Sequence, residues 1–214
     1  MEDAAKPKFY ILSHNIAKRK NVGSMIRSAV AFGVDKFFLI NKTEEQIKKS
    51  KVLKQFKLSY GAHGTDHRVE YQIFNSIKEA KEWFTANNIT VCGIEITENS
   101  ENVATQPFRG DTVFIAGNEE LGLLPQLKEI CDHFVYVPQY SSKTASLNVT
   151  VATSIVLHHF AVWSQYTEAE KIGEKYMEET KHGEWGTLMK RHLHTGPGKD
   201  AVEDADEANG NPEN

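Results

Sequence analysis

The order of short β-rich runs and amphipathic stretches constrains the fold of this chain more than any other feature. Apolar and β-branched residues cluster at 9–12, 36–40, 90–96, 112–116 and 134–137. Apolar residues recur at helical spacing in the intervening segments 22–32, 44–56, 76–84, 125–131 and 146–163. Strands that alternate with helices of this length form a mostly parallel sheet with helices on both faces. The sequence therefore predicts an α/β fold.

Charge separates the chain into a body and a tail. The net charge of the 214 residues is −4, but residues 200–214 contain six acidic and no basic residues. Residues 1–199 hold 25 basic and 23 acidic side chains, so the body is mildly basic. We predict a domain at 8–164, a helical extension at 165–196 and an acidic, disordered tail at 197–214.

Composition excludes several classes of protein. Hydrophobic residues make up 40% of the chain, which is enough for a packed core. The apolar runs are far too short to span a membrane, and the first residues do not form a secretory signal. The two cysteines, Cys92 and Cys131, form neither a disulfide framework nor a CxxC metal motif. These features predict a cytoplasmic or otherwise intracellular protein that is not secreted.

The loop after the first predicted strand has the residues of a phosphate site. Ligands of parallel sheets bind at the carboxyl ends of the strands, where this loop lies. A Lys-Arg-Lys triplet at 18–20 precedes a helix that Asn21 or Ser24 can cap, and Arg27 follows on that helix. The free amides of a helix N-terminus beside basic side chains favour an anion. An ordinary cap beside solvated surface cations explains the same pattern.

Two further loops carry polar residues at the same predicted edge. Gly117 directly follows the strand at 112–116, where the missing Cβ lets a ligand approach the backbone, and Glu119 adds a carboxylate. A glycine turn with exposed acids is the alternative. Ser146 and Asn148 begin the last helix, which ordinary capping also explains. The chain contains neither GxGxxG nor a P-loop motif, so a dinucleotide or nucleotide site of those types has no support.

Together the three loops resemble the motifs of a known enzyme family, the SpoU or TrmH-like branch of the SPOUT RNA methyltransferases. The residues similar to its first, second and third motifs are 21–29 (NVGSMIRSA) with 32–34 (FGV), 117–123 (GNEELGL), and 137–138 (VP) with 146–152 (SLNVTVA). Their order and separations also fit, and the resemblance extends over about residues 8–164. Many members have a shorter loop, which contains a glycine, between the proline and the serine of the third motif. In this chain residues 139–145 separate the two and include no glycine, so they receive no assigned role.

The resemblance implies a fold, a cofactor and a reaction. The fold contains a deep trefoil knot in the C-terminal half, which the residue pattern alone would exclude. The cofactor is S-adenosylmethionine (SAM), and the reaction is transfer of its methyl group to a ribose 2′-hydroxyl of RNA by a homodimer. The short segment before the first strand is more similar to tRNA members than to rRNA members with an N-terminal RNA-binding domain, so tRNA is the favoured substrate. An rRNA substrate and a non-catalytic RNA-binding relative are the alternatives.

The resemblance also assigns residues to roles. It implies that Arg27 activates the ribose hydroxyl, either as a base or by binding the adjacent phosphate, and the second role is favoured because an arginine stays protonated. The other implied catalytic positions are Asn21, Glu119, Ser146 and Asn148. The implied cofactor positions, which act mainly through main-chain groups, are Ala116, Gly117, Asn118, Val137 and Leu147.

Two features lie outside the motifs. Six lysines between residues 42 and 57 form, with the triplet at 18–20, either a track for the RNA backbone or a solvated helix face. His63 and His67 are four residues apart, but Gly61 and Gly64 interrupt a helix there. We therefore expect no metal site.

Overall fold

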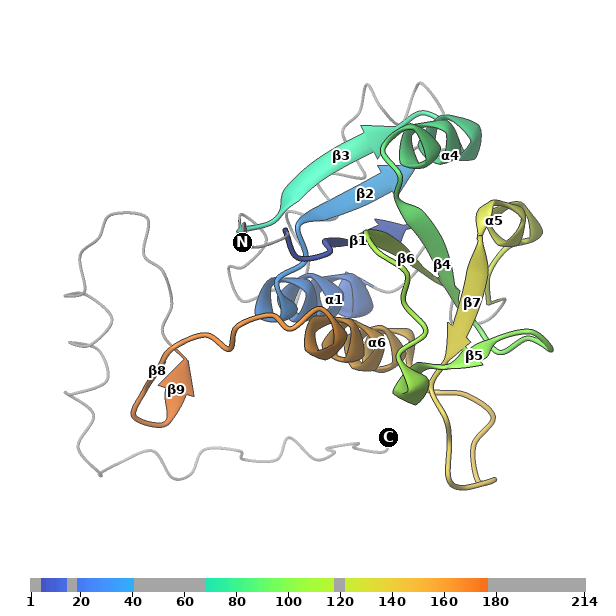
Figure 1. Ribbon diagram of the computed structural model, residues 1–214. Helices are drawn as coiled ribbons and strands as arrows, with labels where there is room; N and C mark the ends of the chain where they lie inside the picture. The colour runs from blue at the N-terminus through green and yellow to red at the C-terminus, as the bar shows by residue number, and fades with distance from the viewer. Residues whose placement is uncertain (1–4, 15–18, 41–67, 118–121, 177–214) are drawn as a thin grey trace, which may run out of the picture. The chain divides into compact units, whose positions relative to one another are not determined.

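The computed structural model describes residues 5–14, 19–40, 68–117 and 122–176. The chain forms two compact units, Met1–Thr167 and Glu168–Asn214. The described elements of the first unit are β1 (Phe9–Ser13), α1 (Arg19–Phe32), β2 (Lys36–Ile40), β3 (Glu70–Phe74), α4 (Ile77–Ala86), β4 (Thr90–Ile94), β5 (Glu101–Asn102), the 3₁₀ helix η2 (Val103–Thr105), β6 (Thr112–Ala116), α5 (Pro125–Ile130), β7 (His133–Tyr136) and α6 (Val149–Trp163), and Figure 1 shows their arrangement.

The strands of the first unit form one sheet in the order β3-β2-β1-β6-β4-β7-β5. Each pair of neighbouring strands is parallel, so their carboxyl ends lie along one edge. Every residue of the central strands β1 and β6 is buried. Strands covered on both faces are apolar throughout rather than alternating, which is why these segments stood out in the sequence. The predicted parallel α/β fold is confirmed.

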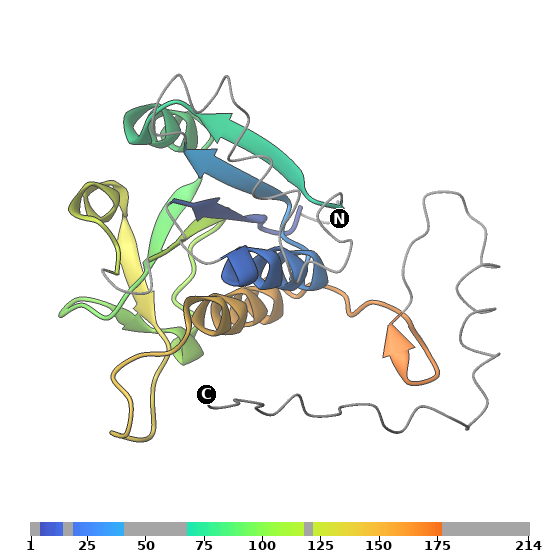
Figure 2. The ribbon, with the colours of Figure 1, turned by 180° about the vertical axis from the view of Figure 1, so that it is seen from behind.

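Helices cover both faces of the sheet. Helices α1 and α6 lie side by side on one face, and α4 and α5 lie on the other (Figures 1 and 2). Successive residues of β1 divide between the two cores: Phe9 and Ile11 pack under α1 and α6, whereas Tyr10 and Leu12 pack under α4 and α5. The ring of Phe160 on α6 stacks on Phe9 with 4.8 Å between centroids. Burial of a side chain of this size contributes about 1.5–3 kcal/mol, so both layers are held by their apolar faces.

Local signals in the sequence set the starts of three helices. The Ser76 hydroxyl accepts a hydrogen bond from Glu79 N at 3.1 Å and caps α4. Pro125 occupies the first turn of α5, where its missing N–H has no helical partner to lose. Asn148 is the N-cap of α6, so this helix begins at Val149, and Ser146, which the sequence placed at the helix start, lies before it. Each of these signals acts within a few residues, which is why it can be recognised without tertiary information.

The structure differs from the sequence prediction at the start of α1. The helix begins at Arg19, so Asn21 lies in its first turn and does not cap it, and the prediction that Asn21 or Ser24 is the cap is wrong. The side chain of Asn21 instead accepts a hydrogen bond from Asn148 on α6. A partner 127 residues away along the chain gives no local signal.

The second unit also differs from the prediction. Two short antiparallel strands, β8 (Lys171–Ile172) and β9 (Lys175–Tyr176), form a hairpin within the segment predicted to be helical. Gly173 in its turn has a φ of +62°, a conformation that disfavours other residues. Residues 165–170 of the predicted helical extension are also not helical, and its residues 177–196, the acidic tail and the predicted helix at 44–56 lie outside the described residues.

Candidate active site

A cavity of about 270 Å³ opens at the carboxyl edge of the sheet. Its walls come from the residues that end or follow β4, β6 and β7, together with the start of α6. These segments are far apart in the sequence and meet because parallel strands place their carboxyl ends along one edge. Ligands of open α/β sheets bind at this edge.

The cavity collects all four of the described residues that the motif resemblance assigns to the cofactor. Ala116, Gly117, Val137 and Leu147 line it, and so does Ser146 from the catalytic set. Ser146 is exposed, and its carbonyl accepts a hydrogen bond from Thr144 Oγ1 at 3.1 Å. Asn118 and Glu119, which belong to the same predicted site, lie outside the described residues.

The structure gives a different reason for glycine at position 117 from the one the sequence suggested. A Cβ on Gly117 would lie 2.6 Å from the carbonyl carbon of Gly122 and 2.8 Å from the backbone nitrogen of Leu123. The absent side chain therefore makes room for the backbone of Gly122 and Leu123 rather than for a ligand. Gly122 has a φ of +64°, which also favours glycine. This close approach of two backbone segments forms one wall of the cavity.

Asn21 and Asn148, both predicted catalytic residues, are brought into contact. Asn148 Nδ2 donates to Asn21 Oδ1 at 3.3 Å, and Thr150 Oγ1 donates to the Asn21 carbonyl at 3.0 Å. Farther along the same helix pair, Ser154 Oγ donates to Ser28 Oγ at 2.8 Å. These bonds connect the first motif on α1 to the third motif on α6 beside the cavity.

Arg27, the residue expected to activate the ribose, does not line this cavity within one chain. It lies on the exposed side of α1. Among the predicted catalytic residues that the structure describes, Asn21, Ser146 and Asn148 lie at the start of α6. Arg27 is exposed on the neighbouring helix α1.

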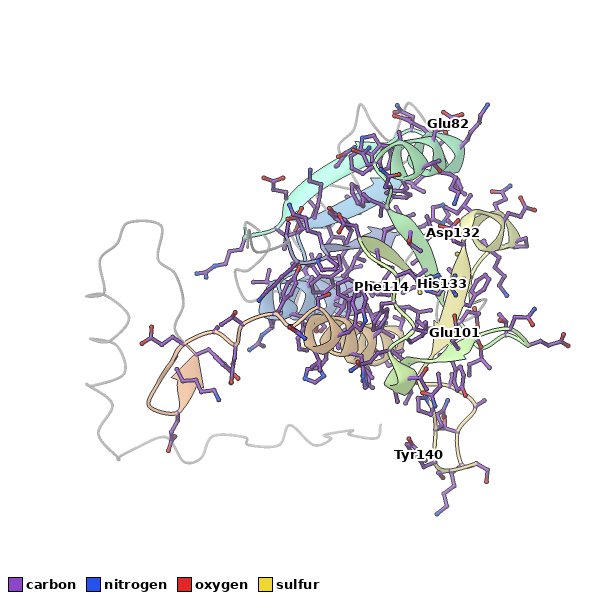
Figure 3. All side chains as sticks on the ribbon, in the orientation of Figure 1. Glu82, Glu101, Phe114, Asp132, His133 and Tyr140 are labelled. Carbon is purple, nitrogen blue, oxygen red and sulfur yellow. The ribbon has the colours of Figure 1, made fainter. Side chains whose placement is uncertain are left out.

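Two polar residues of the cavity were missed by the sequence analysis. Glu95 directly follows β4, and its Oε2 accepts a hydrogen bond from Leu123 N at 2.8 Å. The β-rich run at 90–96 includes Glu95, so the sequence alone does not mark it as a residue at the strand end, whereas the structure ends β4 at Ile94. Gln139 belongs to the loop after β7 that departs from the family pattern, and no motif marked it. Figure 3 shows this loop extending away from the sheet with Tyr140, which is 94% exposed.

The model of the SpoU rRNA Methylase family matches residues 8–158, which include all three motifs. The chain belongs to the SpoU methylase family. The match covers both the parallel sheet and the walls of the cavity, so the resemblance seen in the motifs is confirmed. The deep trefoil knot stays a prediction.

Relatives of this SpoU family chain include enzymes that act on two kinds of RNA. A tRNA (guanosine(18)-2′-O)-methyltransferase of Aquifex aeolicus is 25% identical over 150 residues, which cover 69% of this chain and 66% of that enzyme. The 23S rRNA (guanosine-2′-O-)-methyltransferase RlmB of Acinetobacter baylyi is 26% identical over 138 residues, which cover 64% of this chain and 53% of that enzyme. In both comparisons the matched part is less than two thirds of the relative's length.

A solved SpoU structure shares the fold. The crystal structure of the SpoU methyltransferase AviRb from Streptomyces viridochromogenes, in complex with the cofactor AdoMet, matches with a TM-score of 0.60 and 21% identity. The similarity covers 77% of this chain and 60% of that chain.

Across residues 5–14, 19–40, 68–117 and 122–176, no three His, Cys, Asp or Glu residues gather in a way that could hold a metal ion. None of the helices in these same ranges has the length and apolar character needed to cross a membrane. The six lysines between 42 and 57 and the pair His63 and His67 lie outside the described residues.

Proposed function

We propose that this protein is a SAM-dependent RNA methyltransferase that transfers a methyl group to a ribose 2′-hydroxyl. The observation that carries the proposal is the cavity at the carboxyl edge, because it unites the second and third motifs at one place beside the first. Relatives that carry out 2′-O-methylation of tRNA and of rRNA support the reaction type.

The residues around the cavity fit SAM. Main-chain groups at Gly117, Val137 and Leu147 offer hydrogen-bond partners for an adenine edge, and apolar side chains of the wall suit its ring faces. The Oε1 atom of Gln139 is buried without a hydrogen-bond partner, as expected for an acceptor that awaits a ligand donor. SAM, when bound, supplies an electrophilic methyl group, so the protein has to align and activate the hydroxyl.

The residues of this chain divide that task. We assign Asn21, Glu119, Ser146 and Asn148 to holding the ribose and the cofactor by hydrogen bonds. We assign Arg27 to the phosphate beside the target ribose, because an exposed guanidinium suits a bidentate phosphate contact and is a poor base. Positioning of the two reactants and proton removal are the two effects that accelerate such a transfer.

A homodimer is part of the proposal. On α6, Val151 is 48% exposed and Val162 is 54% exposed, although this helix is apolar on most sides. Exposed apolar residues on a helix that borders the cavity suit a contact between two copies of the chain. Sedimentation of the full chain at micromolar concentration should give the mass of a dimer, and a monomer would contradict it.

The remaining assignments are proposed with the function. Residues 8–164 form the methyltransferase domain, residues 165–196 a C-terminal extension and residues 197–214 an acidic tail. We favour tRNA over rRNA as the substrate and an intracellular location.

Incubation with labelled SAM and purified RNA tests the function. The full chain should transfer label to tRNA, and the methylated nucleotide should resist alkaline cleavage at its 3′ side because its 2′-oxygen is blocked. Label in rRNA alone would assign the rRNA alternative. Label on a base, or binding of RNA with no transfer to either RNA, would overturn the proposed reaction.

A further inference from the structure

Among the cavity residues that belong to none of the three motifs, Glu95 and Gln139 carry a carboxylate and an amide. Glu95 enters the wall from the end of β4, and Gln139 enters it from the loop after β7. Glu95 is the one carboxylate in the part of the wall that the structure describes. Both residues present oxygen atoms, which accept hydrogen bonds.

The Glu95 carboxylate is fixed in the wall. Its Oε2 accepts from Leu123 N at 2.8 Å, and its Oε1 accepts from Ile96 N at 3.3 Å. A Cβ on Gly122 would meet this carboxylate, so glycine at 122, which its φ of +64° already favours, leaves room for Glu95 where it lies. A carboxylate has about four acceptor positions, and the two backbone amides use two of them. Glu95 is therefore held in place with acceptor capacity left for a ligand.

Gln139 lacks a partner for its own acceptor. Its Oε1 is buried and receives no hydrogen bond from the protein. Buried oxygens in proteins nearly always have a donor, and in a cavity wall a bound molecule can supply it. Because Glu95 and Gln139 line the same cavity, one ligand can contact the side-chain oxygens of both residues.

We propose that Glu95 and Gln139 form an acceptor pair that binds hydrogen-bond donors of the cofactor. The donors available on SAM are its ribose hydroxyls, its adenine amino group and the ammonium of its amino-acid part. A fixed carboxylate is a good partner for either a pair of ribose hydroxyls or an ammonium group. This inference rests on the proposed function.

Calorimetric titration with S-adenosylhomocysteine, the demethylated product, tests the pair in the full chain without catalysis. The variants are Glu95→Gln, which keeps an acceptor for Leu123 N but removes the charge, and Gln139→Leu, which removes the amide at similar size. Each should raise the Kd about tenfold, equivalent to about 1.4 kcal/mol. The matched control is Glu98→Gln, because Glu98 is exposed nearby and undergoes the same change of charge. It should bind like the wild type.

Thermal melting of the free protein separates binding from structure. Gln139→Leu removes a buried oxygen without a partner, so its melting temperature should equal or exceed that of the wild type while its affinity falls. A lower melting temperature in step with the lost affinity would indicate a structural role and would overturn the assignment.

A second ligand identifies the donors that Glu95 receives. The ligand 5′-methylthioadenosine has the nucleoside but lacks the amino-acid part. Equal weakening of both ligands by Glu95→Gln assigns the ribose hydroxyls, and weakening of S-adenosylhomocysteine alone assigns the ammonium. Wild-type affinity in either variant overturns the pair and leaves the proposed function intact. Failure of the wild type to bind S-adenosylhomocysteine overturns both.

Discussion

Replacement of Asn148 by alanine tests the contact between α1 and α6 that brings the first and third motifs together. Asn148 Oδ1 accepts from Thr150 N at 3.0 Å and from Val151 N at 3.4 Å, and Asn148 Nδ2 donates to Asn21 Oδ1 at 3.3 Å. The first two bonds satisfy amides that have no partner within the helix. The third connects the two helices directly.

The magnitude follows from these bonds. Loss of an asparagine N-cap costs about 0.5–2 kcal/mol, and the long, exposed bond to Asn21 adds about 0.5 kcal/mol at most. We expect Asn148→Ala to lower the free energy of unfolding by about 1–2 kcal/mol, and the melting temperature by about 2–8 °C for a domain of this size. Asn148→Asp retains the acceptor and adds a negative charge at a helix N-terminus, so it should remain within about 0.5 kcal/mol of the wild type.

Urea denaturation followed by circular dichroism measures the stability of both variants, and transfer of labelled methyl groups to RNA measures their function. Asn148→Asp cannot donate to Asn21, so transfer should fall at least tenfold although the protein is stable. Wild-type stability of Asn148→Ala would refute the capping argument. Equal losses of stability in the two variants would refute the argument that Asn148 stabilises the protein by accepting hydrogen bonds from the first amides of α6. Full methyl transfer by Asn148→Asp would refute the role of the contact with Asn21.

Three further predictions use other parts of the first unit. Arg27→Ala should reduce methyl transfer about 100-fold, because the target ribose loses the contact that positions its phosphate. Calorimetric affinity for S-adenosylhomocysteine should be unchanged, because Arg27 does not line the cavity. Arg68→Ala is the charge-matched control, and a weakened affinity in Arg27→Ala would contradict this division. Gly117→Ala should lower the free energy of unfolding, measured by urea denaturation, by about 1–3 kcal/mol and abolish binding of S-adenosylhomocysteine, because the new Cβ would lie 2.6 Å from the Gly122 backbone. A stable variant that binds normally would show that the backbone at 117 and the backbone at 122 can move apart. Burial, with a smaller contribution from a nearby arginine, lowers the pKa of His133 below its usual 6.5, so the unfolded chain takes up this proton first and stability falls as the pH drops below 6.5. His133→Leu should flatten the pH dependence of the unfolding free energy in that range, and an unchanged slope would contradict the assignment.

Local sequence patterns predict most of the strands and helices. They fail where a strand is exposed or where a residue's role depends on a partner far away in the sequence. The runs that became β1, β2, β4, β6 and β7 are apolar because they lie inside the sheet. The edge strand β3 was missed because only Phe74 at its end is buried and the strand begins with the exposed Glu70. The hairpin at 171–176 was assigned to a helix because two-residue strands have too little pattern to recognise.

The same distinction applies to the candidate site. The motifs marked Gly117, Ser146 and Leu147, and the structure places all three at one cavity. Glu95 was not marked, because its significance depends on the amide of Leu123, 28 residues away. Arg27 was marked, but its place outside the cavity of its own chain depends on how α1 lies beside α6.

The alternation of strands and helices and the family of the chain can be predicted from the sequence, because periodicity and motifs act over short distances. The position of β6 between β1 and β4 is visible only in the folded domain, and it brings the ends of three strands and the start of α6 to one cavity. Strand order depends on which apolar surfaces pack together across the whole domain, and no short segment contains that information.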